Sequence, residues 1–316
     1  MTLTPPLTII SENLDDELSI LLDVKQQLGN PPSLQSWNSS SSLCDWPEIT
    51  CIDNIVTEIS LSYKTITKKI SARICDLKNL IVLDKNFFVG SIPADIDRLS
   101  QFGALKKLKY LWMTEANLIG EIPESFNNLS SLELLDLLVN KLEGTIPGGM
   151  LTLKNLNYLH LFINRLSGHI PSSIEALNLK EIDISDNHLT GSIPTGFEKL
   201  QNLTGLNLFW NQLSGEIPAN ISLIPTLETF KVFSNQLSGV LPPTFGLHSE
   251  LKLFEVSENK LSRELPQHLC AKGALLGVVA SNNNLSGEVP MSLGNCTNGN
   301  SFSRTLPSKL ARNFAQ

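Results

Sequence analysis

Residues 129 to 152 read LSSLELLDLLVNKLEGTIPGGMLT, and residues 153 to 176 read LKNLNYLHLFINRLSGHIPSSIEA. The second stretch repeats the leucine, asparagine, glycine and Ile-Pro positions of the first, so the chain is built from repeats. An asparagine marks the frame every 23 or 24 residues, at Asn140, Asn164, Asn187, Asn211, Asn235, Asn259 and Asn283.

Each repeat predicts one coil of a stacked array. Leu135 and Leu137 alternate with outward-facing residues, which is the two-residue period of a short strand. Strands of successive coils would lie about 4.8 Å apart in a parallel sheet, with equivalent residues stacked. An asparagine at a buried turn could satisfy backbone groups of its own coil and the next one. A single coil buries too little apolar surface to offset its chain entropy, so only the array is stable.

The repeat and its flanks resemble a known family. The unit LxxLxxLxLxxNxLxGxIPxx resembles the plant-type leucine-rich repeat, and the segments at 17–38 and 44–51 (CDWPEITC) resemble the N-terminal cap of plant receptor-like kinases. VTEISL, ARICDLKNL and LNLFWNQLSGEIP are similar to the HAESA-like receptors of secreted peptide hormones. The resemblance implies an α/β fold: a leucine-rich repeat solenoid, a right-handed superhelix with a parallel concave β-sheet and a helical N-terminal cap.

Four segments are expected along the chain. They are a disordered N-terminus at 1–13, the cap at 14–52, about ten leucine-rich repeats at 53–298, and an incomplete final repeat or tail at 299–316. The frame slips near 84, 100 and 298, and the first two slips suggest that whole coils have been lost there. The array is otherwise regular, so the function should be spread over successive coils.

The cap is expected to begin with a helix. LDDELSILLDVKQQL at 14–28 places its leucines on one face, with either early aspartate as cap and Gly29 as stop. Trp37 and Trp46 are expected in the core of the cap rather than at a ligand.

Charge and cysteine usage exclude several functions. A net charge of −7 argues against a nucleic-acid surface, because such surfaces are basic. The five cysteines form no CxxC pair and the chain has no His-rich cluster, so no metal or other cofactor is expected. The resemblance implies a disulfide between Cys44 and Cys51. Cys270 and Cys296 lie about one coil apart and either bridge or sit adjacent in the stack, while Cys75 has no counterpart one coil later.

Glycosylation signals point to a secreted chain. Six Asn-x-Ser/Thr sequons occur, at Asn38, Asn128, Asn202, Asn220, Asn284 and Asn295. An Asn- and Leu-rich repeat also produces such triplets by itself. The first residues show no signal-peptide pattern and no stretch is long and apolar enough to span a membrane. The family localises to the extracellular face of the plasma membrane, an expectation that these features of the chain do not themselves support.

No catalytic motif is recognisable, so the chain is not expected to be an enzyme. There is no phosphate loop, no HExxH and no Ser-His-Asp arrangement, and the five histidines are scattered. The outward strand positions instead repeat large aromatics: Phe162, Phe209 and Phe233 stand two residues before the frame asparagine, with Trp210 beside Phe209. Contiguous exposed aromatics mark binding sites. The alternative is that these phenylalanines pack internally at the strand ends.

Charge on the same outward positions favours a basic ligand. Acidic residues outnumber Lys231 there, although a solvated acidic face explains the charges equally well. In HAESA-like receptors an extended peptide carrying a hydroxyproline lies on the inner face, which implies roles for Trp210, Phe233 and Ser257 in LNLFWN, FKVFSN and FEVSEN. Trp210 departs from the family, where an acidic residue is expected. The candidate ligand-binding residues are Phe162, Phe209, Trp210, Lys231, Phe233, Glu255 and Ser257.

The sequence therefore predicts a ligand-binding leucine-rich repeat ectodomain fragment of a plant receptor-like kinase, which recognises a secreted extended peptide on its concave face. Its expected partners are that peptide and, in the full-length protein, a co-receptor kinase ectodomain. One alternative is a secreted recognition or defence protein resembling polygalacturonase inhibitors. Another is part of a receptor Ser/Thr kinase whose kinase domain is absent from this chain.

Overall fold

The computed structural model describes residues 7–62, 64, 66, 68–84, 90–92 and 107–296. These residues form two compact units, one within residues 1–143 and one within residues 144–316. The expected frame slips near 84, 100 and 298 and the expected tail at 299–316 fall mainly outside the described residues.

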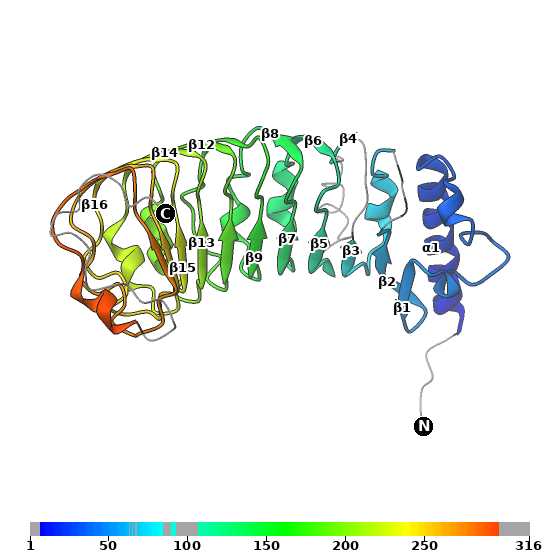
Figure 1. The fold of residues 1–316 in the computed structure, drawn as a ribbon. Coiled ribbons are helices and arrows are strands. Elements are labelled where there is room, and N and C mark those ends of the chain that lie inside the picture. Colours follow the sequence, from blue (N-terminus) through cyan, green and yellow to red (C-terminus); the bar gives the residue numbers. More distant parts are fainter. Residues whose placement is uncertain are drawn as a thin grey trace, which may run out of the picture. The chain divides into compact units, whose positions relative to one another are not determined.

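The first unit holds one long helix and two sets of short strands (Figure 1). These elements are α1 (Leu7–Gln27), β1 (Ile49–Ile52), β2 (Ile55–Ser60), β3 (Val82–Asp84), β4 (Gly90–Ser91), β5 (Tyr110–Trp112), β6 (Leu118–Glu121), β7 (Leu134–Asp136) and β8 (Lys141–Glu143). Strands β1 and β2 form an antiparallel hairpin, which the sequence did not predict. Strands β2, β3, β5 and β7 then pair in parallel, and β4, β6 and β8 form a second parallel sheet.

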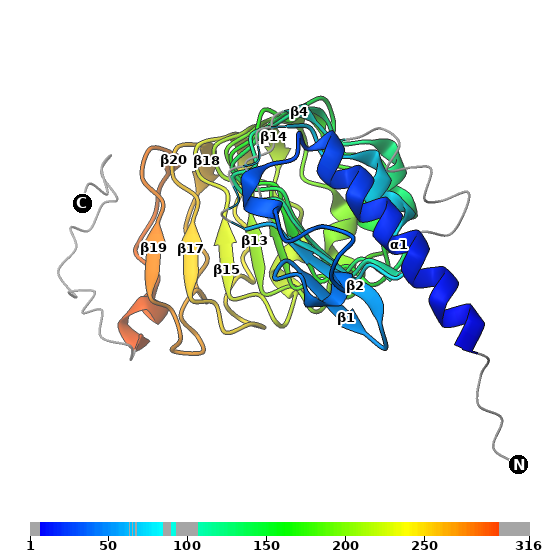
Figure 2. The same ribbon diagram turned by 90° about the vertical axis from the view of Figure 1, so that its right-hand side faces the viewer.

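The second unit repeats the same plan with greater regularity. Its strands are β9 (Tyr158–His160), β10 (Ser167–His169), β11 (Glu181–Asp183), β12 (His188–Gly191), β13 (Gly205–Asn207), β14 (Gln212–Glu216), β15 (Thr229–Lys231), β16 (Gln236–Val240), β17 (Leu253–Glu255), β18 (Lys260–Arg263), β19 (Gly277–Val279) and β20 (Asn284–Leu285). The odd-numbered strands form one parallel sheet and the even-numbered strands another. Figure 2 shows β13, β15, β17 and β19 side by side. A disulfide joins Cys270 to Cys296, with their Cα atoms 5.8 Å apart.

Short 3-10 helices complete many of the coils. They are η1 (Pro32–Leu34), η2 (Leu43–Asp45), η3 (Ala72–Asp76), η6 (Glu124–Asn128), η7 (Met150–Thr152), η8 (Thr195–Lys199), η9 (Ala219–Leu223) and η10 (Met291–Asn295). Several begin directly after the proline of the Ile-Pro pair, as η8 does after Pro194. The missing N–H of proline leaves no donor unsatisfied at that position, which explains why the repeat keeps it there.

Helix α1 begins earlier than the sequence predicts. The expected start was near Asp15, after a disordered segment at 1–13, but the helix is formed from Leu7. No glycine or proline interrupts residues 7–27, so no residue in this segment stops a helix from extending toward its N-terminus. At its end Gly29 has a φ of +82°, a conformation that favours glycine. Glu17, Ile20, Leu21 and Val24 of α1 are buried, a helical spacing that packs one side of the helix into the cap, and Leu28 is buried just after its end.

One step of the first sheet is longer than the rest. Leu83 of β3 pairs with Leu111 of β5, a step of 28 residues, whereas Leu111 pairs with Leu135 of β7 after 24. The parallel register is nevertheless kept on both sides of this step. The two slips seen in the sequence are therefore absorbed between β3 and β5, with four residues more than a regular coil.

The frame asparagines hold adjacent coils together through their side-chain amides. Asn187 is buried, and its Nδ2 donates to the carbonyls of Leu161 at 3.0 Å and Ser185 at 2.9 Å. Its Oδ1 accepts the Leu166 N–H at 2.9 Å. Asn211, Asn235, Asn259 and Asn283 repeat this pattern. The predicted bridging role is confirmed, but the bridged neighbour is the preceding coil rather than the next one.

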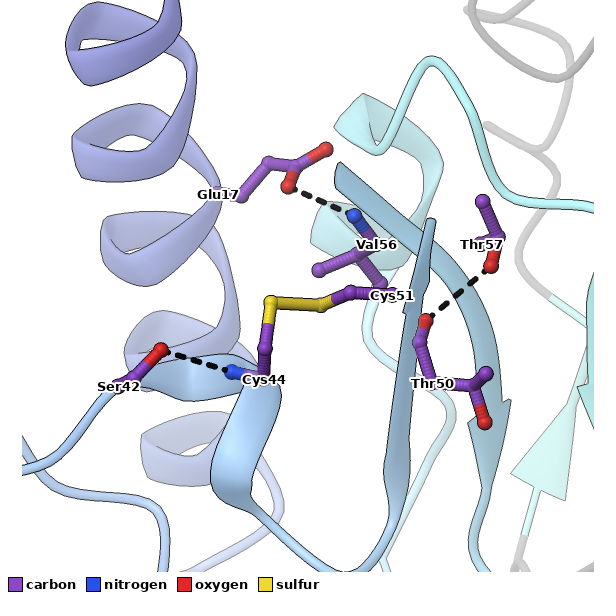
Figure 3. The surroundings of a disulfide bond; sticks show 7 residues. All are labelled: Glu17, Ser42, Cys44, Thr50, Cys51, Val56 and Thr57. Atoms are coloured by element: carbon purple, nitrogen blue, oxygen red, sulfur yellow. Dashed lines mark hydrogen bonds between the residues drawn. A yellow bond between two sulfur atoms is a disulfide. The ribbon is translucent and has the colours of Figure 1, made fainter. Parts of the chain in front are cut away.

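The cap is closed by a disulfide and by hydrogen bonds to the first coil (Figure 3). Cys44 and Cys51 are joined with their Cα atoms 5.6 Å apart, which is the pairing that the resemblance implied. The buried carboxylate of Glu17 on α1 accepts the Val56 N–H of β2 at 3.0 Å. This contact ties the helix to the strand that starts the array.

Two stacked tryptophans form the centre of the cap. The rings of Trp37 and Trp46 lie 5.3 Å apart at 17°, and both side chains are buried, as expected. The Nε1–H of Trp37 donates to Glu48 Oε2 at 2.9 Å, and Lys64 Nζ lies 2.5 Å from Glu48 Oε1. Burial alone raises the pKa of Glu48, but the hydrogen bonds from Lys64 and Trp37 and the charge of Lys64 outweigh it and lower that pKa.

This arrangement predicts a pH-dependent contribution to stability. Because the pKa of Glu48 is depressed on folding, its contribution is present above the ordinary carboxyl pKa and is lost as pH falls through the folded value. Replacing Glu48 by Gln should lower the free energy of unfolding at pH 7 by about 1–3 kcal/mol. The difference from the parent should shrink toward zero near pH 3, as followed by urea unfolding at both pH values. Replacement of the exposed Glu121 by Gln is the control, and an equal loss at both pH values for Glu48→Gln would contradict the prediction.

Candidate functional site

In the second unit, equivalent residues of the odd-numbered strands line up from strand to strand. Each outward-facing position of the strand therefore forms one row of side chains. Ile182, Leu206 and Phe230 point inward and are buried. Their flanking residues point outward, and the parallel register places equivalent residues side by side, such as Asp183 beside Asn207. We call this outward side, together with the two residues before each frame asparagine, the strand face.

Four aromatic side chains gather at the end of the strand face, and we call Phe162, Phe209, Trp210 and Phe233 the aromatic cluster. The rings of Phe209 and Phe233 are stacked, with centroids 4.5 Å apart at 7°. Trp210 stands across both of them, 5.6 Å from Phe209 at 76° and 5.9 Å from Phe233 at 80°. Two coils away from Phe209 along the row of equivalent positions, Phe162 still lies within 5.8 Å of it.

The aromatic cluster is a surface feature rather than part of the core. Its three phenylalanines are half-buried and Trp210 is 49% exposed, so they do not pack inside the coil as the alternative proposed. Ser185 occupies the equivalent position between Phe162 and Phe209 and is fully buried. A small residue in that position leaves room for the two phenylalanine rings to approach each other.

Trp210 also has a strained backbone. Its φ is +50°, in the left-handed region, as it is for the equivalent residue of the other coils, including Ile163 at +53°. For residues other than Gly, Asn or Asp this conformation costs roughly 1–2 kcal/mol. Because successive coils share this turn conformation, the backbone of Trp210 is a property of the repeat, and only its large exposed side chain sets it apart. The backbone strain cannot be read from the sequence, although Trp210 does stand in a column otherwise rich in Asp, Glu, Ser and Asn.

A polar group lies beside the aromatic cluster. Asp183 accepts the Ser185 N–H at 3.2 Å, the Ser185 hydroxyl, and Asn207 Nδ2 at 3.3 Å. Burial raises the pKa of Asp183, although these hydrogen bonds and nearby His160 oppose the rise. His160 Nε2 lies 3.8 Å from Glu181 Oε2 and, through that contact, lowers the pKa of Glu181. This group was not among the sequence-predicted ligand residues, because the contacts of Asp183 with Asn207 and of His160 with Glu181 join residues of adjacent coils.

The remaining predicted ligand residues differ in accessibility. Lys231 Nζ and Glu255 Oε1 lie 3.2 Å apart, with side chains 25% and 22% exposed, so the pair neutralises itself at the surface. Ser257 is only 8% exposed, and its contact with a ligand stays a prediction. Its backbone carbonyl accepts the Ser234 N–H at 3.0 Å. Ser257 therefore supports the strand face from below.

The sequons of the second unit fall outside the positions of the strand face. Asn202 and Asn220 are exposed in a turn and in η9, and Asn284 is exposed at the start of β20. Asn295 ends η10, and its side chain is not described. In the first unit Asn128 is exposed and Asn38 is half-buried. Glycosylation at these positions remains a prediction.

The described residues show few other features of a chemical site. No group of three or more His, Cys, Asp or Glu side chains in that part of the chain could hold a metal ion. Of the helices that the structure describes, none has the length and apolar character that a membrane crossing requires. Cys75 is buried in η3.

Comparison with known proteins places the fold among plant proteins. Residues 14–52 match the family described as Leucine rich repeat N-terminal domain, and residues 178–200 and 202–223 match Leucine Rich Repeat. The Leucine-rich repeat protein FLOR 1 of Arabidopsis thaliana is 34% identical over 95 residues, which is 29% of each chain. The LRR receptor-like serine/threonine-protein kinase GSO2 of the same plant is 34% identical over 125 residues, or 37% of this chain and 10% of the kinase. The chain thus spans less than a third of the curated relatives it matches.

Solved structures extend the likeness over most of the chain. The ectodomain of GASSHO1/SCHENGEN3 from Arabidopsis thaliana, in complex with CASPARIAN STRIP INTEGRITY FACTOR 2, superposes with a TM-score of 0.74 at 32% identity, covering 86% of this chain and 36% of that one. A plant ice-binding protein gives 0.71 at 29% identity, covering 87% and 89%. The Arabidopsis receptor kinase HAESA, bound to the peptide hormone IDA and a co-receptor, gives 0.61 at 28% identity, covering 90% and 64%.

The segments that match the two families coincide with the cap and the repeats seen in the structure. The segment that matches the N-terminal domain family is the segment that forms most of α1, the stacked tryptophans and the Cys44–Cys51 disulfide. The segments that match the repeat family form strands of the two parallel sheets. The chain thus combines a leucine-rich repeat N-terminal domain with leucine-rich repeats in a fold like that of plant receptor ectodomains, and its relatives are plant leucine-rich repeat receptor kinases and related proteins.

Proposed function

We propose that the strand face of the second unit binds an extended peptide, with the aromatic cluster as its main contact. The observation that carries this proposal is Trp210, a half-exposed indole that stands against two stacked phenylalanines. Exposed aromatic anchors of this kind supply much of the binding energy in protein interfaces. The HAESA ectodomain, which this chain resembles, was solved in complex with the peptide hormone IDA, and the GASSHO1/SCHENGEN3 ectodomain in complex with CASPARIAN STRIP INTEGRITY FACTOR 2.

An extended ligand suits the geometry of the strand face. Its strands are fully paired in the interior of the sheet, so a ligand cannot extend the sheet there and must be recognised through side chains. Successive coils step by about 4.8 Å, and an extended peptide advances about 3.3 Å per residue. A peptide of four or five residues laid across the strands would therefore reach from Phe162 to Phe233.

The proposed setting is a receptor of which this chain forms an extracellular part. The membrane receptor kinases among its relatives support this setting, and the exposed sequons agree with it. In that setting a co-receptor ectodomain, such as the one bound to HAESA, is a possible second partner of the whole protein. The chain itself is assigned no catalytic role.

We do not extend ice binding to this chain, despite its likeness to a plant ice-binding protein. Recognition of a crystal lattice requires the same small group at each step of the array. The residues that follow the repeat glycine on the second sheet of this unit are His169, Ser192, Glu216 and Val240, which differ in size, charge and polarity. This chain therefore shares the repeating fold of the ice-binding protein, but the side chains at this position of its second sheet do not repeat.

The proposal is tested by peptide selection on the intact chain. A phage-displayed library of random dodecapeptides should yield binders, and replacing both Phe209 and Phe233 by Ala should weaken their affinity at least about tenfold, because truncation of aromatic anchors costs upwards of about 2 kcal/mol. Replacing Trp210 by Asn should weaken binding similarly while leaving the free energy of unfolding equal or higher, since Asn accepts a left-handed conformation. Affinity is measured by calorimetry and stability by urea unfolding.

Val139 provides the matched control. It has the same left-handed backbone as Trp210, with a φ of +56°, but belongs to the first unit and so lies outside the strand face. Val139→Asn should therefore relieve the same strain without loss of affinity. Unchanged affinity in the Phe209 and Phe233 double variant would remove the proposal. A library that yields no binder at all would remove it as well.

A further inference from the structure

One row of the strand face brings the exposed indole close to an exposed carboxylate. The residues directly before the frame asparagines stack one per coil, and we call Asp186, Trp210, Ser234 and Glu258 the turn row. Their backbones are joined in sequence: the Asp186 N–H donates to the Phe209 carbonyl at 2.9 Å, and the Trp210 N–H to the Phe233 carbonyl at 3.1 Å. Trp210 and Glu258 are therefore fixed two coils apart, or roughly 10 Å.

Ser234, a small residue, lies between Trp210 and Glu258 and orients the Glu258 carboxylate. Ser234 Oγ donates to Glu258 Oε2 at 2.5 Å, which draws the Glu258 carboxylate back over Ser234, toward Trp210. Glu258 is exposed, and the Ser234 hydroxyl that donates a hydrogen bond to it carries no charge that would neutralise the carboxylate. The ring of Phe233, beside Ser234, lies 5.9 Å from the indole at 80°. The exposed indole of Trp210 and the exposed carboxylate of Glu258 thus border the position of Ser234 on its two sides in the turn row.

The charge balance of the strand face favours a cation at that position. Five carboxylates lie on this part of the chain, at Glu181, Asp183, Asp186, Glu255 and Glu258. The one lysine on the same face, Lys231, is already paired with Glu255. Glu258 therefore keeps its charge available to a ligand.

A planar cation matches both borders. A cation is attracted to the face of an indole, and the attraction grows when water is excluded. A guanidinium can stack on the ring with one face while its edge donates to a carboxylate, and it is less strongly hydrated than an ammonium. A guanidinium stacked on the exposed indole can extend its edge along the turn row toward Glu258, because its hydrogen bonds lie in its own plane, at right angles to the stacking direction.

We propose that the ligand of the strand face carries a basic side chain, preferentially arginine, that lies over Ser234 between Trp210 and Glu258. This inference rests on the proposed peptide-binding function and adds the chemistry of one ligand position. In this inference Glu258 selects a positively charged ligand side chain, and Trp210 selects a planar one.

The test uses the peptides selected from the random dodecapeptide library. Peptides selected on the parent chain should be enriched in arginine at one position, and those selected on Glu258→Gln should not. For one synthetic binder, replacing that arginine by the neutral isostere citrulline should weaken calorimetric affinity about tenfold on the parent. The same replacement should change affinity by less than about twofold on Glu258→Gln, because the charge it removes no longer has a partner.

Two controls make the outcome specific. Glu216 is an exposed carboxylate on the other sheet of the same unit, so Glu216→Gln should keep the full discrimination between arginine and citrulline. Raising the salt concentration should weaken the arginine peptide more than the citrulline peptide. Binders without a basic residue, or equal affinity for the two peptides on the parent chain, would overturn this inference while leaving peptide binding intact. A library without binders would overturn both.

Discussion

Replacing Trp37 by Ala should lower the free energy of unfolding by about 3–5 kcal/mol, the usual cost of truncating a buried tryptophan. The side chain is fully buried, stacks on Trp46 and donates to Glu48. Its loss leaves a cavity and also a buried carboxylate with one donor fewer. The cap covers the first coil of the array, so the measured unfolding should become less cooperative as well as less stable.

A conservative replacement separates packing from hydrogen bonding. Trp37→Phe keeps an aromatic ring against Trp46 but removes the Nε1–H donor to Glu48, and should cost about 1–2 kcal/mol less than Trp37→Ala. Urea unfolding followed by far-UV circular dichroism gives the free energies. If Trp37→Phe were as damaging as Trp37→Ala, the hydrogen bond to Glu48 rather than ring packing would dominate. If neither variant were destabilised by more than about 1 kcal/mol, the tryptophan stack would not be the centre of the cap.

Replacing Asn187 by Ala should cost about 2–4 kcal/mol, because it removes a buried side chain that makes several hydrogen bonds to backbone. The carbonyls of Leu161 and Ile184 each keep a second asparagine donor. The group left without a partner is the Leu166 N–H, which lies in the preceding coil. The damage should therefore be largest on the N-terminal side of the substitution.

Amide hydrogen exchange tests this direction. In Asn187→Ala the Leu166 amide should exchange faster than in the parent, by a larger factor than amides two coils away. Asn178→Ala is the matched control, because Asn178 is exposed and makes one hydrogen bond, to the Lys154 carbonyl at 2.9 Å. It should cost less than about 0.5 kcal/mol. Equal costs for the two variants would show that the asparagine bridges do not stabilise the array.

Much of the candidate site could be inferred from the repeat. Because equivalent residues stack, the spacing of Phe162, Phe209 and Phe233 was enough to place them in one row, and the structure brings them to ring contact. Accessibility was not predictable in the same way. Ser257 occupies the same row but is buried, since the exposure of a small side chain depends on the size of its neighbours in other coils.

The interactions that tune the site could not be read from the sequence. The pairing of Lys231 with Glu255 and the hydrogen bond from Ser234 to Glu258 join residues 24 apart, and each depends on the rotamers that the side chains adopt. The left-handed backbone at Trp210 likewise arises from the turn that every coil shares. The early start of α1 was missed for a different reason, because no residue at 7–13 signals a helix boundary.

The period of the sequence by itself determined the parallel strands, the equivalence of residues in successive coils and the structural role of the frame asparagines. It could do so because a repeated pattern of apolar and polar residues leaves one way to bury every coil against the next. The tertiary structure alone decided which of the equivalent side chains remain exposed and which pair with each other. Those properties depend on contacts between side chains of neighbouring coils, whose distances and orientations a one-dimensional period does not contain.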